Sequence, residues 1–213
     1  MKNSDLTIDI VDYGIGNIGS VARMIEKSGG IARRITSPKE LINSTKIILP
    51  GVGNFDHGMS QLISLGWVEI LDEKVMKNGI PLLGICLGMQ LLCNKSEEGI
   101  IPGLGFIDAD VVKFKDNYIE KLKIPNMGWR DIHLVRENPL FNSSIYEERF
   151  YFVHSFFVDC KDTNITIASS NYGIEFCAAF QSNNIFGVQF HPEKSHRFGM
   201  ELLKRFIGIK SYA

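Results

Sequence analysis

The sequence predicts a single α/β domain over residues 1–213, with a mostly parallel central sheet flanked by helices and a C-terminal antiparallel β portion. Short apolar runs that read as inner strands alternate with helical patterns in the first half of the chain. After Gly105 the pattern changes to strands joined by turns. The chain has 213 residues, 45% of them apolar, which is enough for one substantial core and disfavours two large domains.

The expected elements follow from these patterns in chain order. Strands are predicted over residues 6–11, 30–35, 46–49 and 80–83, and helices up to about 28, over 57–65, over 68–77 and over 89–93. Beyond them the expected strands cover residues 106–114, 150–158, 165–169, 176–181 and 185–190, with a loop through 124–129 and a final helix over 196–207.

The composition excludes several classes of protein. A net charge of −1, from 23 basic and 24 acidic residues without a block of like charge, disfavours binding to nucleic acid or an anionic membrane. The four cysteines show no C-x-x-C spacing, so we expect reduced thiols, a cytoplasmic location and no metal site. The uncharged stretch 79–93 is too short and too broken by Pro and Gly to span a bilayer, and the N-terminus has no uninterrupted apolar core.

The clearest chemical signal is a cysteine at a glycine-flanked corner. The spacing Gly84-x-Cys86-x-Gly88 falls between an apolar strand and a helix, which is the form of a nucleophile elbow. The amides of a helix N-terminus favour the reactive thiolate of such a cysteine. The alternative is that Cys86 fills the core, since free cysteine is among the most buried residue types.

A base and its orienting group stand together near the other end of the sequence. His191 directly follows an apolar strand, and Pro192 stiffens the link to Glu193, whose carboxylate can reach the imidazole. His57 and His133 have no comparable company, His196 lies on the expected final helix, and His154 follows a strand without an adjacent acid. His191 is therefore the best candidate for the base that a thiolate nucleophile needs.

Acyl chemistry also needs donors for the developing oxyanion. The amide of Leu87 follows the nucleophile directly, and the glycine-flanked loop at Gly51, Val52 and Gly53 offers a second N–H. Such donors are worth about 10²- to 10³-fold in rate.

A second glycine pattern supports a hypothesis of another class. Gly14-x-Gly16-x-x-Gly19 follows a strand and precedes a helix, as in a dinucleotide fingerprint, so a non-catalytic nucleotide-binding module is one alternative. However, the second strand ends in Arg33 and Arg34 instead of an acidic residue, which favours a tight structural turn and leaves NADP as a weaker option.

Taken together, the segments at 50–53, 84–90 and 191–193 resemble the class I glutamine amidotransferases. The resemblance implies a flavodoxin-like core, no cofactor, and a cysteine that attacks the side-chain amide of glutamine, forms a glutamyl thioester and releases ammonia. It makes Cys86 the nucleophile, His191 the base and acid, and Glu193 the orienter. It also implies a glutamine-binding set of Gly51, Gln90, His154 and Ser155.

Further segments, at 12–20, 126–129, 151–155 and 191–195, resemble the HisH family, the glutaminase subunit of imidazole glycerol phosphate synthase. This resemblance implies a heterodimer with a cyclase subunit that receives the ammonia, and it makes the glycine turn an interface loop. The implied partner interface comprises Gly16, Asn17, Asn126, Trp129, Tyr151 and Lys194.

Two departures from the pattern of the HisH family leave open a second acceptor for the ammonia. Phe156 stands where the family commonly has tyrosine, and residues 195–200 with Pro125 and Asn126 resemble a paralogous branch found with surface-polysaccharide genes. That branch implies a sugar amidotransferase as the partner. A cysteine hydrolase that acts without any partner is a third interpretation.

Overall fold

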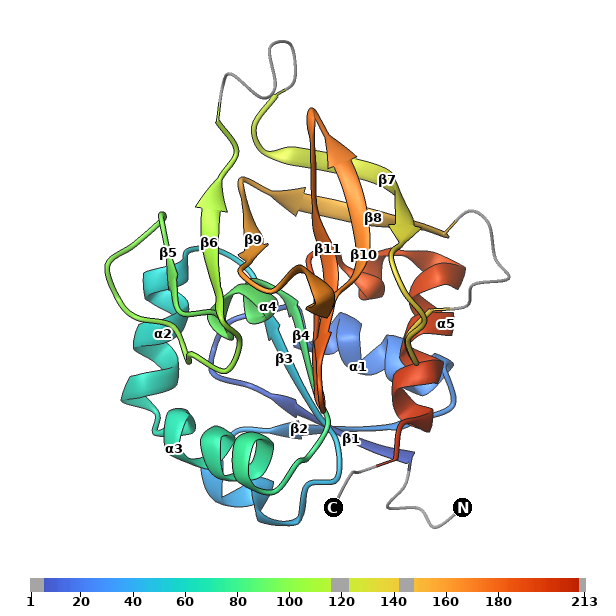
Figure 1. Cartoon of the computed structure of the whole chain (residues 1–213). Helices are drawn as coiled ribbons and strands as arrows, with labels where there is room; N and C mark the ends of the chain where they lie inside the picture. Colours follow the sequence, from blue (N-terminus) through green and yellow to red (C-terminus); the bar gives the residue numbers. More distant parts are fainter. Residues whose placement is uncertain (1–5, 116–122, 142–147, 211–213) are drawn as a thin grey trace.

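The computed structural model describes residues 6–115, 123–141 and 148–210. Within them, twelve strands join into one sheet, whose main path runs β2-β1-β3-β4-β12-β11-β10-β7-β8 (Figure 1). The elements of the first half are β1 (Thr7–Val11), α1 (Ile18–Lys27), β2 (Ile31–Ile35), η2 (Pro38–Asn43), β3 (Ile47–Gly51), α2 (Phe55–Ser64), α3 (Trp67–Leu71), η3 (Asp72–Lys77), β4 (Leu82–Cys86), α4 (Leu87–Leu91) and β5 (Lys95–Ser96). The second half adds β6 (Ala109–Lys113), β7 (Asn126–Leu134), β8 (Glu148–His154), β9 (Phe156–Cys160), η5 (Thr163–Ile165), β10 (Thr166–Tyr172), β11 (Ile174–Ser182), β12 (Ile185–Val188), η6 (Pro192–Lys194) and α5 (His196–Gly208).

The first half of the sheet is parallel and covered on both faces. Strands β2, β1, β3, β4 and β12 pair in parallel, and their side chains are almost all buried in β3, β4 and β12. Helices α1 and α5 pack with Ile8, Ile48 and Leu83 on one face, whereas α2 and α3 pack with Ile47 and Leu82 on the other (Figure 1). Burial on both faces explains the continuous apolar runs of these strands.

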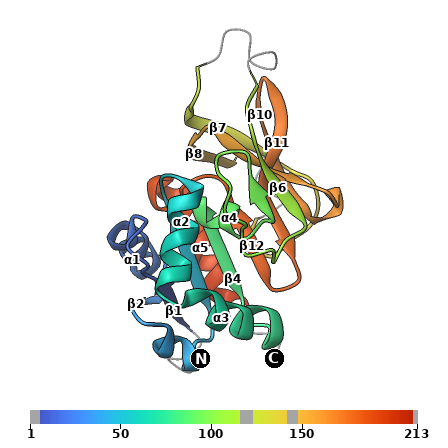
Figure 2. The ribbon, with the colours of Figure 1, turned by 90° about the vertical axis from the view of Figure 1, so that its left-hand side faces the viewer.

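The second half is antiparallel and rises above the parallel half (Figure 2). Strand β12 lies at the change of direction, because it pairs in parallel with β4 and antiparallel with β11. A side branch joins β5, β6 and β9 to β11. The predicted α/β class with a C-terminal antiparallel portion is therefore confirmed.

Several predicted boundaries were wrong. The strand expected over 80–83 runs from Leu82 to Cys86, so the nucleophile candidate ends a strand instead of sitting within a turn. The expected loop at 124–129 is largely the start of β7, which pairs with β8 from Asn126↔His154 onward. The single strand expected over 150–158 divides at Ser155 into β8 and β9, which pair with different neighbours.

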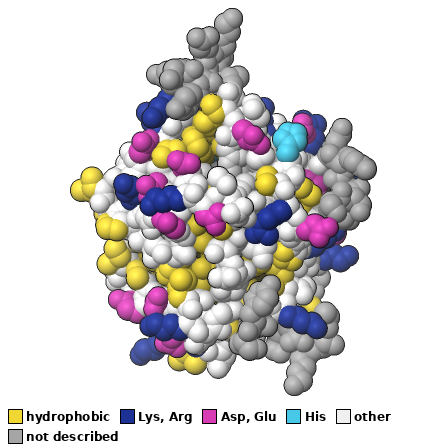
Figure 3. All heavy atoms as spheres, viewed as in Figure 1, with side chains coloured by type: hydrophobic (Ala, Val, Ile, Leu, Met, Phe, Trp, Pro, Cys, Tyr) yellow, Lys and Arg dark blue, Asp and Glu magenta, His cyan; other side chains and the backbone are white. Residues whose placement is uncertain are grey.

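The surface carries no dominant charge on the face shown in Figure 3, where Lys and Arg side chains alternate with Asp and Glu. In the part of the chain that the structure describes, every helix is too short or too polar to cross a bilayer.

Candidate active site

Cys86 is held in a backbone conformation that L-residues rarely adopt. It ends β4 with a φ of 54°, and α4 begins at the next residue. Such a conformation costs about 1–3 kcal/mol and persists only where the surroundings enforce it. The side chain is 6% exposed and lines a cavity, so the fold keeps the thiol accessible at the strand's end.

Packing explains the two glycines that flank Cys86. A Cβ on Gly84 would lie 2.8 Å from the carbonyl oxygen of Gly88 and from the backbone of Met89. A Cβ on Gly88 would lie 1.8 Å from the carbonyl oxygen of Leu49 in β3. In both cases the added Cβ would clash with backbone atoms, which cannot rotate away as a side chain can. The turn at Cys86 therefore requires glycine at both positions.

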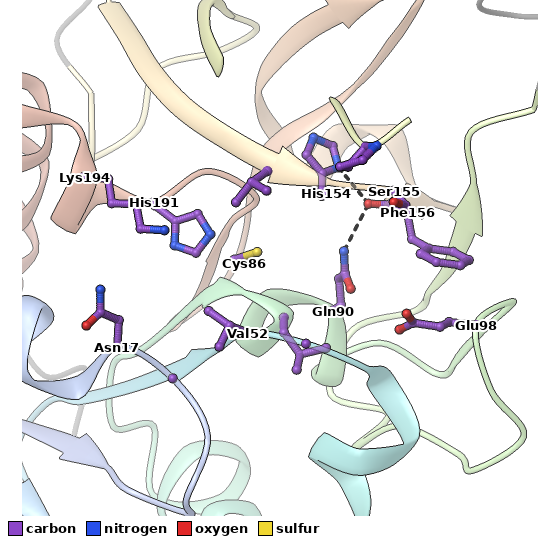
Figure 4. Close-up of a pocket in the computed structure, with 15 residues that line it drawn as sticks. Asn17, Val52, Cys86, Gln90, Glu98, His154, Ser155, Phe156, His191 and Lys194 are labelled. Carbon is purple, nitrogen blue, oxygen red and sulfur yellow. Dashed lines mark hydrogen bonds between the residues drawn. The ribbon is translucent and has the colours of Figure 1, made fainter. Parts of the chain in front are cut away.

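His191 reaches the thiol because its strand is the neighbour of β4. Strand β12 pairs in parallel with β4 up to Val188↔Ile85, so the residues that follow both strands meet at one edge of the sheet. The His191 amide donates to the carbonyl oxygen of Tyr151 over 2.9 Å, which fixes the backbone there. The ring lies beside Cys86 in Figure 4.

Glu193 orients the imidazole. Its Oε1 lies 2.8 Å from Nδ1 of His191, and both side chains are almost fully buried. The other ring nitrogen of His191, Nε2, has no nitrogen or oxygen partner among the described residues. Because the ring lies beside Cys86, Nε2 is the nitrogen available to the thiol. Thiol, imidazole and carboxylate thus lie in series, an arrangement that suits a nucleophile, a base and an orienting group.

Burial lowers the pKa of His191, but the charge and contact of the Cys86 sulfur, followed by Glu193, outweigh it and raise the pKa to about 10. The imidazole therefore carries a proton at neutral pH. An imidazolium beside the sulfur stabilises a thiolate, which is the nucleophilic form of cysteine.

We expect Cys86→Ala to lower the pKa of His191, since it removes the strongest interaction that raises it. With a folded pKa above the ordinary value of about 6.5, the proton on His191 stabilises the fold fully below about pH 6.5, and this contribution is lost as the pH rises through about 10. An NMR titration of the His191 ring in both proteins measures the change. The same pKa in both proteins would contradict the pairing.

A cavity of about 720 Å³ opens over Cys86. Figure 4 shows His191 and Lys194 on one side of Cys86, with Gln90, Glu98 and Phe156 on the other. The sequence-predicted residues that line it are Gly16, Asn17, Val52, Gly53, Cys86, Leu87, Gln90, His154, Ser155, His191 and Lys194. The fold therefore brings together side chains from both halves of the sequence.

The other predicted residues lie behind or beside the cavity. Gly51 is buried where β3 approaches the elbow, and a Cβ there would lie 2.8 Å from the Gly88 amide. Asn126 has no exposed surface, so in this structure its side chain is not available to a partner. Trp129 is stacked on His196 at 5.6 Å and contacts Tyr151, over whose ring Lys194 lies.

The far wall of the cavity is a chain of buried hydrogen bonds. The carbonyl oxygen of Phe156 accepts from Gln90 Nε2 at 3.1 Å and from His154 Nδ1 at 2.7 Å. Asn126 Nδ2 then donates to His154 Nε2 at 3.0 Å. Burial lowers the pKa of His154 to about 4, despite the Phe156 carbonyl, so this ring is neutral and structural.

Sequence reasoning missed three residues of the site. Gln189 is fully buried beside Cys86, and its position two residues before His191 was the only available signal. Glu98 lines the cavity and accepts the Phe55 amide at 2.8 Å, but it lies in a loop without a motif. Phe156 stood out only as a departure from a resemblance, whereas its carbonyl holds both Gln90 and His154.

The glycine turn lies against this site. Gly16 has a φ of 111°, packs near Pro50 and lines the cavity. Arg33 donates to Asp9 at 2.6 Å and Arg34 pairs with Asp12, so both guanidinium groups already have carboxylate partners. These contacts weaken the NADP interpretation, because a 2′-phosphate would have to compete with them.

Among the residues that the structure describes, no three His, Cys, Asp or Glu side chains are grouped to hold a metal ion. The four cysteines carry free thiols.

Comparison with known proteins gives a consistent result. Residues 9–209 match the family Glutamine amidotransferase class-I. A relative from Methanococcus maripaludis named imidazole glycerol phosphate synthase subunit HisH 2 is 51% identical over 94% of this chain and 98% of its own. A relative from Bdellovibrio bacteriovorus named subunit HisH is 48% identical over 95% of this chain and 100% of its own. A relative from Pseudomonas aeruginosa named subunit HisH 2 is 46% identical over 95% of this chain and 99% of its own.

Solved structures support the fold. A protein titled glutamine amidotransferase superimposes with a TM-score of 0.73 at 14% identity, covering 95% of this chain and 99% of its own. A glutamine amidotransferase from Thermotoga maritima gives a TM-score of 0.66 at 19% identity, covering 96% of this chain and 81% of its own.

Proposed function

This chain belongs to the class I glutamine amidotransferases and, within them, to the HisH family, and on that premise we propose that Cys86 hydrolyses glutamine for an imidazole glycerol phosphate synthase. The products are glutamate and ammonia, and the ammonia passes to the cyclase subunit in histidine biosynthesis. The observation that carries the assignment of the site is that Cys86 and His191 line one cavity side by side, with Glu193 bonded to the ring of His191 from behind.

Acylation begins with the thiolate–imidazolium pair. The sulfur of Cys86 adds to the side-chain carbonyl carbon of glutamine, and the carbonyl electron pair moves onto the oxygen. His191 gives its proton to the amide nitrogen, which leaves as ammonia when the C–N bond breaks. A glutamyl thioester on Cys86 remains.

Deacylation returns the site to its first state. The now neutral His191 takes a proton from water as the water oxygen bonds to the thioester carbon. The C–S bond then breaks, the thiolate is restored beside an imidazolium, and glutamic acid leaves and ionises. Glu193 holds the ring in one orientation through both steps.

Two backbone amides would stabilise the oxyanion. Leu87 N–H follows the nucleophile at the start of α4. The second comes from the loop at Val52 and Gly53, which lines the cavity. Gly53 has a φ of 98° and nothing within 4 Å of a Cβ position, so the peptide has room to turn its N–H inward.

The remaining groups of the cavity suit an amino acid. Gln90 and the backbone at His154 and Ser155 would hold the substrate, with Gly51 keeping the loop close to the elbow. Glu98 is a carboxylate on the same wall and would pair with the substrate's ammonium group. No cofactor takes part in this chemistry.

The partner surface lies around the opposite side of the cavity. Gly16, Asn17 and Lys194 line this side, and the exposed parts of Trp129 and Tyr151 adjoin Lys194. We place the cyclase subunit of a heterodimer there. The free thiols accord with a cytoplasmic location.

A second acceptor has its own support. Phe156 stands where the family commonly has tyrosine, and residues 195–200 with Pro125 and Asn126 resemble a paralogous branch found with surface-polysaccharide genes. A sugar amidotransferase of surface-polysaccharide biosynthesis is therefore the alternative partner.

Supplying each acceptor to the purified protein tests the proposal. We expect a histidine-pathway cyclase to stimulate glutamine hydrolysis, measured as glutamate formed, and Lys194→Ala to reduce that stimulation more than the basal rate. Exposed Lys204, on α5 and outside the cavity, provides the matched control Lys204→Ala. If only a sugar amidotransferase stimulated glutamine hydrolysis, the sugar amidotransferase would be the partner instead of the cyclase. If neither protein stimulated hydrolysis, both proposed partners would be wrong.

A further inference from the structure

Gln189 is a buried carboxamide that the triad does not use. It has no exposed surface and follows β12, two residues before His191. Its amide Nε2 lies 3.7 Å from the sulfur of Cys86, and its Oε1 lies 3.0 Å from Nε2 of Gln90. One side chain therefore contacts both the nucleophile and a residue of the proposed glutamine pocket.

The surrounding hydrogen bonds fix which end of this amide faces the sulfur. Gln90 Nε2 donates to Phe156 O and to Gln189 Oε1. Turning the Gln189 amide over would place its NH₂ group against that of Gln90, with two donors face to face. The N–H of Gln189 must therefore point at Cys86.

The backbone of Gln189 is equally restrained. Its amide N–H donates to the carbonyl oxygen of Ala178 in β11 at 2.9 Å. On the Gln90 side, the Phe156 carbonyl also accepts from His154, whose other ring nitrogen accepts from Asn126. A buried network in which each of these bonds is made holds its members in one geometry.

A thiolate is a stronger acceptor than a thiol, so an N–H at this position stabilises the charged sulfur preferentially. We propose that Gln189 is a further catalytic residue, whose amide N–H holds the Cys86 thiolate while its oxygen ties Gln90 to the same group. The inference rests on the proposed function for its catalytic meaning. The contact itself can be tested without turnover.

The other titratable groups near Cys86 come from several elements. His191, Glu193 and Lys194 follow β12, His154 ends β8 and Glu98 lies beyond β5. Tyr13, which follows β1, also interacts electrostatically with Cys86. The test must separate Gln189 from these groups, so it compares substitutions that differ at Gln189 alone.

The experiment follows alkylation of Cys86 by iodoacetamide against pH, with the modified residue resolved by mass spectrometry. Gln189→Met keeps the volume and loses the donor, and we expect the rate at pH 7 to fall about 10-fold and the profile to move to higher pH. Gln189→Glu keeps both volume and the acceptor for Gln90, but places a carboxylate beside the sulfur. We expect a larger shift in this variant.

Gln181→Met, at the surface end of β11, is the matched control and should leave the profile unchanged. In turnover with the stimulating acceptor, Gln189→Met should lower kcat more than it raises KM, because Gln90 keeps its bond to Phe156. If both Gln189 variants folded and their Cys86 were alkylated with the same pH profile as in the wild type, the inference would be overturned. A shifted profile in a protein without glutaminase activity would refute the proposed function and leave the contact supported.

Discussion

Replacement of Cys86 by alanine is expected to abolish ammonia production. The thioester cannot form without the sulfur, and loss of a nucleophile from a triad costs on the order of 10⁶-fold in kcat. Glutamate release, followed with the stimulating acceptor present, measures the loss. The cavity walls do not depend on the sulfur, so glutamine binding by calorimetry should persist.

The matched control is Cys160→Ala, because this cysteine is also free but lies in β9 and does not line the cavity. It should retain activity. If Cys86→Ala hydrolysed glutamine at the normal rate, Cys86 would be core filling and the triad would be wrong. High turnover by the wild-type chain without any acceptor would instead favour a hydrolase that acts alone.

Gly88→Ala is expected to destabilise the protein by about 3 kcal/mol or more, and to remove activity from what remains folded. The new Cβ would lie 1.8 Å from the Leu49 carbonyl oxygen and 3.3 Å from the Pro50 carbonyl carbon. Neither atom belongs to a flexible side chain, so β3 and the elbow must separate. Denaturant unfolding measures the loss of stability.

Gly208→Ala provides the comparison, because a Cβ at the end of α5 meets nothing within 4 Å. Its stability should change by less than about 1 kcal/mol. Equal stabilities for the two variants would show that the close approach at Gly88 is relieved at little cost.

The grouping of Cys86, His191 and Glu193 could be predicted because its signals are local. The glycine spacing around Cys86 and the stiff His191-Pro192-Glu193 segment are short patterns whose geometry depends on adjacent residues. The order of apolar runs likewise predicted the parallel half, where burial on both faces leaves uninterrupted hydrophobic strands.

The missed features depend on pairing between distant segments. Strand β7 contains Gly128 and partly exposed side chains, and becomes a strand through its pairing with β8. The chain bends at Ser155 and its strand partners change there, but Val153, Phe156 and Phe157 on either side are all strand-forming residues, so the sequence shows no break. Gln189 contacts Cys86 across 103 positions and Glu98 contacts Phe55 across 43, and no periodicity in the sequence could indicate either contact.

The position of β12 between β4 and β11 also decides when the reactive centre comes into existence. Cys86 and Gln189 are separated by 103 positions, and His191 and Glu193 come later still. During synthesis on the ribosome, β1, β3 and β4 emerge before β12. The thiol of Cys86 therefore has no imidazole beside it until β12 pairs with β4. The nascent chain therefore carries Cys86 without its imidazole neighbour, and the two side chains come together only once both halves of the sheet have joined.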